Sequence, residues 1–219
     1  MSLPPSFELE LAQLSYLSPQ DRVTKLEEYT GNSYYIPDEF NNDEQFSVVS
    51  NDPNGTLFNV HRGSSTFEDW ADSDVSLALG NLPQTNRYKR AFKTSAQAAL
   101  KYGGDRRVVE VGHSLGGALA HHISDMQGHD SVAFNPGSTP LESGRSRKNQ
   151  HLTFRTDQDI VSKFDKNNVN TIGVKQRNGD VDNILKKNEE RKFLRNGTLS
   201  RINKIVQTIR GHSLDNFKT

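Results

Sequence analysis

Most of the information about the fold lies in the stretch Val108-Val109-Glu110-Val111-Gly112-His113-Ser114-Leu115-Gly116-Gly117-Ala118-Leu119-Ala120. Its first four residues have the β-branched composition of a buried strand. The residues from Leu115 onward suit a helix. Between them, residues 112–116 fit the pattern Gly-x-Ser-x-Gly. We therefore predict a strand, a tight turn with Ser114 at its apex, and a helix.

The segments on both sides of this stretch alternate between the patterns of strands and helices. Asp52-Pro53-Asn54-Gly55 is a strong turn signal that joins two of the strands in a hairpin. Alternation of this kind predicts a parallel α/β sheet. The expected strands cover residues 46–49, 56–61, 108–111, 131–134, 151–155 and 169–175, and the expected helices lie within 7–30 (two short helices), 66–73, 85–102, 115–126 and 182–195.

Two of the expected helices carry further local signals. Ser18-Pro19 is typical of an N-cap followed by proline at the first helical position, and Gly31 is typical of a C-terminal stop. The helix over residues 85–102 has one apolar face and ends at Gly103-Gly104. That face is formed by Phe92, Ala96, Ala99 and Leu100.

The composition excludes several classes of protein. The 219 residues include 27 Lys and Arg and 27 Asp and Glu, and a formal charge of zero argues against a general nucleic-acid binder. No run of about 18 apolar residues could form a transmembrane segment. The absence of cysteine excludes disulfides and thiolate metal sites. Residues 1–140 carry a net charge of −8 and residues 141–219 a net charge of +8, which fits either a polarised surface or two ordinary solvated faces.

Ser114 is the candidate nucleophile. A serine hydroxyl is a weak nucleophile, so it needs a histidine base that a carboxylate orients. In this setting the carboxylate precedes the histidine in the chain. Of the later histidines, four lie on the helix that leaves the turn or at the start of a strand, and His212 lies in a polar loop after an apolar stretch. Elimination therefore favours His212 over His121, His122, His129 and His151.

The carboxylate and the oxyanion hole should lie at neighbouring strand ends. Asp157 and Asp159 both follow the strand over residues 151–155, and position alone does not separate them. The N–H of Leu115, the residue after the nucleophile, is one expected oxyanion donor. The turn over residues 60–65 offers a second donor from another strand end.

Several separate segments together resemble one known family, the class 3 lipases, which comprise the fungal-type triacylglycerol lipases and their phospholipase A1 relatives. The resemblance implies the α/β-hydrolase fold. It spans roughly residues 45–219 of a single domain (1–219), with residues 1–44 matched loosely as an N-terminal helical cap. The matching segments are His61-Arg62-Gly63-Ser64-Ser65-Thr66-Phe67-Glu68-Asp69-Trp70, Gly112-His113-Ser114-Leu115-Gly116-Gly117, Asp159-Ile160-Val161 and Gly211-His212-Ser213-Leu214-Asp215-Asn216-Phe217.

The resemblance also implies roles for individual residues. The acid of the family lies in an Asp-Ile-Val motif, which selects Asp159 over Asp157. Its histidine precedes a Ser/aliphatic run that ends in an aromatic residue, which selects His212. Its second oxyanion donor follows Arg-Gly, which selects Ser64 through both its N–H and its hydroxyl. The implied site is therefore the triad Ser114, Asp159 and His212 with an oxyanion hole at Leu115 and Ser64.

The segment after Ser64 resembles the lid region of the family. Trp70 matches the tryptophan of the lid helix, and Phe67 is a second candidate for contact with substrate. Asn135-Pro136-Gly137 matches the loop beside the active site. The chain departs from the family in three respects. Ser73 stands where an aspartate usually follows the lid tryptophan. Arg90-Ala91-Phe92 replaces a glycine-aromatic motif, and the disulfides of secreted fungal members are absent.

These expectations describe a serine hydrolase of lipid esters that needs no cofactor and no metal. Cations on predicted loops of the basic C-terminal portion would attract anionic phospholipid head groups. They favour phospholipase A1-like activity, with peripheral contact to an anionic membrane surface, over neutral triglyceride hydrolysis. The cations are Arg145, Arg147, Lys148, Lys163 and Lys166.

Two functions of other classes also fit the sequence. One is an acyltransferase with the same triad, and the other is a non-catalytic lipid- or protein-binding module on a hydrolase scaffold. The start of the chain has no signal-peptide pattern, so we expect a cytoplasmic protein, a virion component or an effector. The sequence does not predict the oligomeric state.

Overall fold

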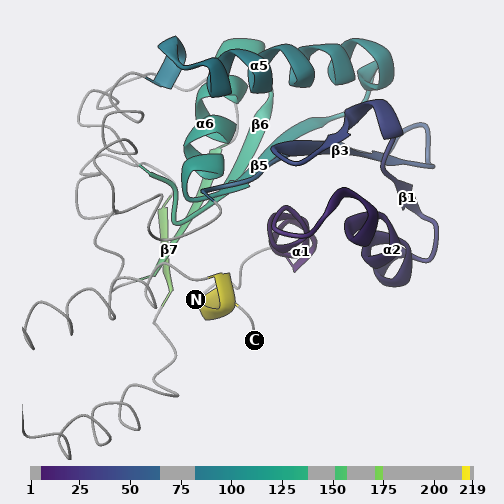
Figure 1. The fold of residues 1–219 in the computed structure, drawn as a ribbon, viewed down its shortest axis with the longest axis horizontal. Coiled ribbons are helices and arrows are strands. Elements are labelled where there is room, and N and C mark those ends of the chain that lie inside the picture. The colour runs from purple at the N-terminus through teal and green to yellow at the C-terminus, as the bar shows by residue number, and fades with distance from the viewer. Residues whose placement is uncertain (1–5, 65–81, 138–150, 157–170, 175–213, 218–219) are drawn as a thin grey trace, which may run out of the picture.

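The computed structural model describes residues 6–64, 82–137, 151–156, 171–174 and 214–217. These residues form a mostly parallel sheet with helices on both faces, which is an α/β-hydrolase-like fold (Figure 1). The helices and short helical turns are α1 (Ser6–Leu14), α2 (Pro19–Thr30), η1 (Asp38–Phe40), η2 (Leu82–Gln84), α5 (Asn86–Ala98), η3 (Ala99–Gly103), α6 (Leu115–Gln127) and η5 (Leu214–Phe217). The strands are β1 (Tyr34–Tyr35), β2 (Asn41–Asn42), β3 (Gln45–Ser50), β4 (Leu57–His61), β5 (Val108–His113), β6 (Asp130–Phe134), β7 (His151–Thr156) and β8 (Thr171–Val174).

The strand order is β1-β3-β4-β5-β6-β7-β8, with β2 paired to β3. β3 and β4 form the expected antiparallel hairpin, and β4 to β8 run parallel. The register pairs His61 with Gly112 and His113 with Phe134, so the carboxyl ends of β4, β5 and β6 meet at one edge of the sheet. The prediction of a parallel α/β sheet is confirmed, and its strands are found within a residue or two of the expected ranges, with β5 extended to His113.

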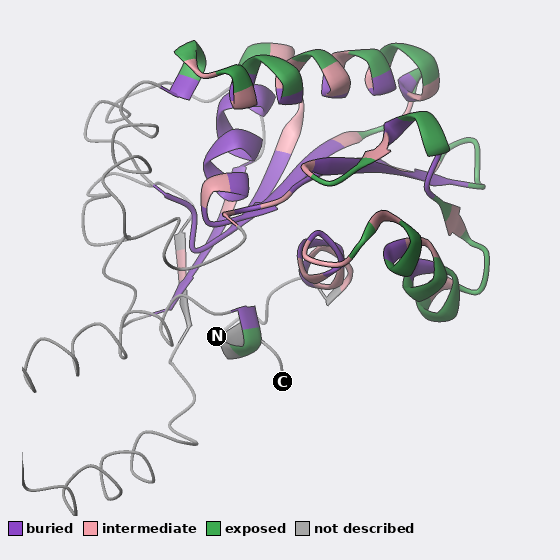
Figure 2. Cartoon of the chain, viewed as in Figure 1, coloured by how far each residue is buried: buried purple, intermediate pink, exposed green. Residues whose placement is uncertain are grey.

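The two faces of the sheet are lined by different chemistry. Side chains alternate between faces along each strand. The face toward α1, α2 and η5 is apolar and includes Phe58, Val60, Val109, Val111 and Phe134. The face toward α5 and α6 carries a row of buried polar side chains, namely Ser47, Asn59, Glu110, Ser131 and Thr153. Figure 2 shows that the central strands are buried between both helical layers.

The N-terminal helices begin and end where the sequence predicts. The Ser18 hydroxyl accepts a hydrogen bond from the Asp21 N–H at 3.2 Å, and Pro19 is the first helical residue of α2. Gly31 ends this helix in the left-handed conformation, with φ 55°. α1 packs against β4, β5 and β6, and η5 of the C-terminal segment packs against α1. The C-terminal end therefore joins the same core as the N-terminal helices.

The helix predicted over residues 85–102 is found as α5 and η3, but its predicted apolar face is only partly buried. The buried side chains of α5 are Tyr88, Ala91, Ser95 and Ala98. Phe92, Ala96 and Ala99 are half-buried, and Leu100 is 88% exposed. Two causes combine: the sheet beneath α5 is polar and accepts Ser95, and the helix changes to the π-helical turn η3 at Ala99, which shifts the later residues around the axis. The expected helices over residues 66–73 and 182–195 lie outside the described residues.

Candidate active site at the carboxyl edge of the sheet

Ser114 occupies a strained turn between β5 and α6. Its φ is 56° and its ψ is −124°, a conformation that non-glycine residues rarely adopt. Strain of this kind persists only where the surrounding structure imposes it. Two hydrogen bonds do so here: the Ser114 N–H donates to the Phe134 carbonyl, and the Ser114 carbonyl accepts from the Gly137 N–H, both at 3.1 Å. Ser114 is only 4% exposed.

The glycines of the motif are needed because the backbones approach too closely for a side chain. A Cβ at Gly112 would collide with the backbone of Gly116. A Cβ at Gly116 would collide with the His61 carbonyl at the end of β4. Both collisions are with backbone atoms, which cannot rotate away. The strand-turn-helix predicted from the sequence is therefore present with the packing that this turn requires.

The turn after β4 lies beside Ser114. A Cβ at Gly63 would contact the Ser114 Cβ at 3.3 Å and the His113 carbonyl at 2.8 Å. Ser64, the next residue, is half-buried. Leu115 is the first residue of α6, where the N–H groups of a helix have no acceptor within the helix. The structure thus brings Leu115 and the turn that holds Ser64 to the same point as Ser114.

An arginine from α5 holds this turn in place. The Arg87 guanidinium donates hydrogen bonds to the Arg62 carbonyl at 3.0 Å and to the Glu44 carbonyl at 2.6 Å. It also pairs with the Glu44 carboxylate at 2.9 Å. The Arg62 N–H in turn donates to the Glu44 carbonyl at 3.0 Å. We call residues 62–64 the oxyanion turn after the donor expected at Ser64, and its backbone is anchored directly before Gly63.

The loop after β6 closes the other side of the turn. Asn135 has a positive φ of 41° and is fully buried. Its side-chain carbonyl accepts a hydrogen bond from the Thr156 N–H at 2.9 Å, and its own N–H donates to the Phe154 carbonyl at 2.8 Å. Through Gly137 the same loop reaches Ser114. The expected position of residues 135–137 beside the turn is confirmed, and the loop connects it to the end of β7.

Glu110 is the centre of a buried polar cluster below the turn. Its carboxylate contacts His61 Nε2 at 2.6 Å and His129 Nδ1 at 2.8 Å, and it accepts hydrogen bonds from Asn59 at 2.9 Å and Ser95 at 3.1 Å. Burial alone would raise the pKa of Glu110, but the hydrogen bonds from His129 and His61 outweigh it and lower the pKa to about 2. A buried carboxylate therefore stays ionised beneath the oxyanion turn.

The histidines that elimination set aside have structural partners. His121 bridges Ser131 and Thr153 at 2.8 and 2.9 Å, and His151 contacts Asp125 at 2.8 Å and Ser131 at 2.6 Å. His122 lies against Tyr88 instead, so the two vicinal side chains diverge as predicted. Within the described ranges, no group of three or more acidic or histidine side chains is arranged to hold a metal ion.

The other predicted site residues lie outside the described residues. Asp159, His212, Trp70 and Phe67 are among them, as are Asp157 and the predicted loop cations Arg145, Arg147, Lys148, Lys163 and Lys166. Two of them are close in sequence to described positions. Thr156 ends β7 three residues before Asp159, and Leu214, two residues after His212, is buried in the core beside α1.

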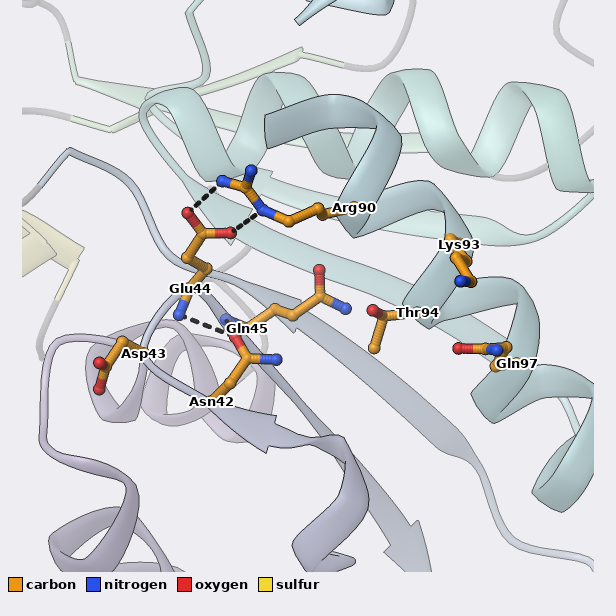
Figure 3. Close-up of a pocket in the computed structure, with 8 residues that line it drawn as sticks. All are labelled: Asn42, Asp43, Glu44, Gln45, Arg90, Lys93, Thr94 and Gln97. Atoms are coloured by element: carbon orange, nitrogen blue, oxygen red, sulfur yellow. Dashed lines mark hydrogen bonds and ion pairs between the residues drawn. The ribbon is translucent and has the colours of Figure 1, made fainter. Parts of the chain in front are cut away.

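A pocket of about 400 Å³, lined by polar residues, lies between α5 and the segment that leads into β3 (Figure 3). Its lining residues come from residues 42–45 and from α5. In Figure 3 the Arg90 guanidinium points at the Glu44 carboxylate and forms two hydrogen bonds with it, at 3.0 and 2.7 Å. The pocket lies next to the residues that anchor the oxyanion turn, and Ser114 is not part of its lining.

A comparison with known protein families identifies the family of this chain. The family described as phospholipase-like, with a Tle-like phospholipase domain, matches residues 30–177. The chain belongs to this phospholipase-like family. The match covers β1 to β8, including the turn at Ser114 and the oxyanion turn, and it leaves α1 and most of α2 outside. It indicates a hydrolase of lipid esters. No curated protein matches the chain significantly.

The membership refines the expectations drawn from sequence. A phospholipase-type family agrees with the expected lipid substrate, and the match does not single out the class 3 lipases. In the parts of the chain that the structure describes, no helix is both long and apolar enough to cross a bilayer. The sequence analysis did not single out Glu110 or Arg87. A charged residue amid valines in a central parallel strand is the signal that could have drawn attention to Glu110.

Proposed function

We propose that this phospholipase-like domain is a serine ester hydrolase of the class 3 lipase type, acting on phospholipids through an acyl-enzyme. The observation that carries the proposal is the φ of 56° at Ser114, held at the carboxyl end of β5 by bonds from two other segments. A buried non-glycine residue adopts this conformation at a nucleophile turn, where the hydroxyl must project above the sheet. We extend the domain to the whole chain, 1–219, with α1 and α2 of residues 1–44 as its helical cap.

The proposed mechanism has two steps. His212 takes the proton from the Ser114 hydroxyl as that oxygen attacks the acyl carbonyl, and Asp159 orients the imidazole and stabilises its charged form. The N–H groups of Leu115 and Ser64, together with the Ser64 hydroxyl, stabilise the oxyanion. His212 then protonates the leaving alcohol, and water releases the acyl group from Ser114 by the reverse sequence of proton transfers.

Described geometry supports this assignment of the donors. Leu115 lies at the N-terminus of α6, where the free N–H groups favour negative charge. A Cβ at Gly63 would lie 3.3 Å from the Ser114 Cβ, so the amide of Ser64 belongs to the residue directly after a backbone position that approaches the nucleophile. Trp70 and Phe67 are proposed to contact the acyl chain. The loop cations Arg145, Arg147, Lys148, Lys163 and Lys166 are proposed to favour anionic phospholipid surfaces over neutral triglyceride.

Hydrolysis of phosphatidylglycerol vesicles and of p-nitrophenyl esters by the wild-type chain and by Ser114→Ala tests the proposal. Removing the nucleophile should lower kcat by about 10⁵-fold or more. Ser33→Ala, at an exposed serine in the turn after α2, should behave as wild type. Product analysis with added alcohol separates hydrolysis from acyl transfer. Retention of full hydrolysis by Ser114→Ala would overturn the proposal.

A further inference from the structure

Tyr16, in the connection between α1 and α2, reaches the site from outside the region that the family match covers. Its hydroxyl lies 2.6 Å from His113 Nδ1, and the two rings meet edge to face with centroids 5.8 Å apart. His113 immediately precedes Ser114, so a side chain of the N-terminal helical segment contacts the strained turn directly. Residues 1–29 lie outside the match, which begins at residue 30.

The same hydroxyl contacts the oxyanion turn. A Cβ at Gly63 would collide with the Tyr16 hydroxyl, which shows how closely the two groups approach. Burial raises the pKa of Tyr16 well above its usual value, while the Arg62 charge and a hydrogen bond with the Gly63 backbone act in the opposite direction. The hydroxyl therefore remains neutral at working pH, and it can accept from the Gly63 N–H while donating to His113 Nδ1.

These contacts join the two halves of the proposed site. The Tyr16 hydroxyl and the Ser114 Cβ both lie close to the position that a Cβ at Gly63 would occupy, and Tyr16 in turn bonds the residue before Ser114. The three groups form a closed triangle of Tyr16, His113 and Gly63. A fixed triangle determines the separation between the oxyanion turn and the nucleophile, which is the distance that stabilisation of an oxyanion depends on.

We propose that Tyr16 is a positioning residue: its hydroxyl bridges His113 and the Gly63 amide and so sets the oxyanion turn at its working distance from Ser114. This rests on the proposed function. It assigns the N-terminal helical segment a part in the chemistry, because the bridge comes from that segment.

Tyr16→Phe removes the bridging oxygen and keeps the packed ring. We expect kcat on a soluble p-nitrophenyl ester to fall by about 10- to 100-fold, because a misplaced donor costs transition-state stabilisation. KM should stay within about twofold, since the substrate contacts are unchanged. Tyr29→Phe, at a half-exposed tyrosine on α2, is the matched control and should keep wild-type kcat and KM. A kcat for Tyr16→Phe within twofold of wild type would overturn the inference.

A second measurement does not depend on activity. The bridge predicts that the Gly63 amide exchanges its hydrogen at least about tenfold faster in Tyr16→Phe than in the wild type, as seen by NMR, while the Val60 amide inside β4 keeps its rate. Unchanged Gly63 exchange would contradict the bridge even if the chain proves inactive. Loss of kcat in Ser114→Ala but not in Tyr16→Phe would leave the proposed function standing and remove Tyr16 from it.

Discussion

Glu110 and His61 face one another across two central parallel strands, with Glu110 Oε2 2.6 Å from His61 Nε2 and both side chains inaccessible to solvent. His61 ends β4 three residues before Ser64, and Glu110 lies in β5 four residues before Ser114. One buried carboxylate therefore ties together the two strands that carry the oxyanion turn and the proposed nucleophile. This contact makes the polar face of the sheet a structural support for the site.

The pH dependence of stability should report this cluster. Because the pKa of Glu110 is lowered to about 2 in the folded chain from its ordinary 4.5, its stabilisation is complete above pH 4.5 and is lost as the pH falls toward 2. The shift corresponds to on the order of 3 kcal/mol. Urea unfolding from pH 6 to pH 2 should show this loss in the wild type and a flatter profile in Glu110→Gln.

Glu110→Gln should also lower the free energy of unfolding at pH 7, since it removes a charge that several buried donors surround. We expect about 3 kcal/mol. The matched control is Glu28→Gln, which breaks an exposed pair with Lys25 and should leave the free energy of unfolding nearly unchanged. Equal stability of the two variants would contradict the structural role given to Glu110.

Close packing at the turn predicts a contrast between two glycines. Gly116→Ala places a methyl group against the His61 carbonyl and should destabilise the chain by roughly 2–3 kcal/mol. Gly103→Ala meets side-chain atoms only at 3.7 Å and beyond and should be nearly neutral. Thermal unfolding of both variants checks this. A neutral Gly116→Ala would show that β4 and α6 are not in contact as described.

Arg87 and Arg90 offer a matched pair on α5. Only Arg87 bonds the Arg62 carbonyl of the oxyanion turn, while both pair with Glu44. Arg87→Lys should lower kcat by about tenfold because an ammonium cannot hold both carbonyls and the carboxylate in one plane. Arg90→Lys should leave kcat within twofold of wild type. Equal effects of the two changes on ester hydrolysis would argue that the anchor is unimportant.

Ser64→Ala tests the second oxyanion donor. The change keeps the backbone N–H and removes the hydroxyl, and loss of one donor typically lowers kcat by about 10²- to 10³-fold. KM should be little affected, because the interaction forms in the transition state. Steady-state kinetics on a soluble ester measures both values. An unchanged kcat would exclude the hydroxyl from the oxyanion hole and leave only the amide.

The sequence was sufficient to predict those helices and strands whose local patterns agree with the fold. The β-branched run before Gly112, the turn signal at Asp52-Pro53-Asn54-Gly55 and the cap at Ser18-Pro19 all specify structure within a few residues, and their elements are found as predicted. The apolar face predicted for α5 is only partly buried because the sheet beneath the helix is polar, so Ser95 is buried and Leu100 is not. A periodic pattern identifies the packed face of a helix only where the surface beneath it is apolar.

In the candidate site, too, local patterns were predictable and long-range contacts were not. Gly-x-Ser-x-Gly identifies Ser114 because only glycine fits at the two flanking positions, where backbone segments approach too closely for a Cβ. Tyr16, Arg87 and Glu110 act through contacts across 97, 25 and 15 residues, respectively, and no local pattern encodes such contacts. Asp159 stays a prediction from resemblance, and His212 stays a prediction from elimination and resemblance. β7 ends at Thr156, three residues before Asp159, and Leu214, two residues after His212, lies in the core.

Labelling with a fluorophosphonate probe, followed by peptide mapping, tests the central claim most directly, because it requires an activated serine and no knowledge of the natural substrate. We predict stoichiometric modification at Ser114 in the wild-type chain, modification slowed by at least about 10³-fold in His212→Ala, and none in Ser114→Ala. Modification of another serine, or no modification of a folded wild-type chain, would contradict the account.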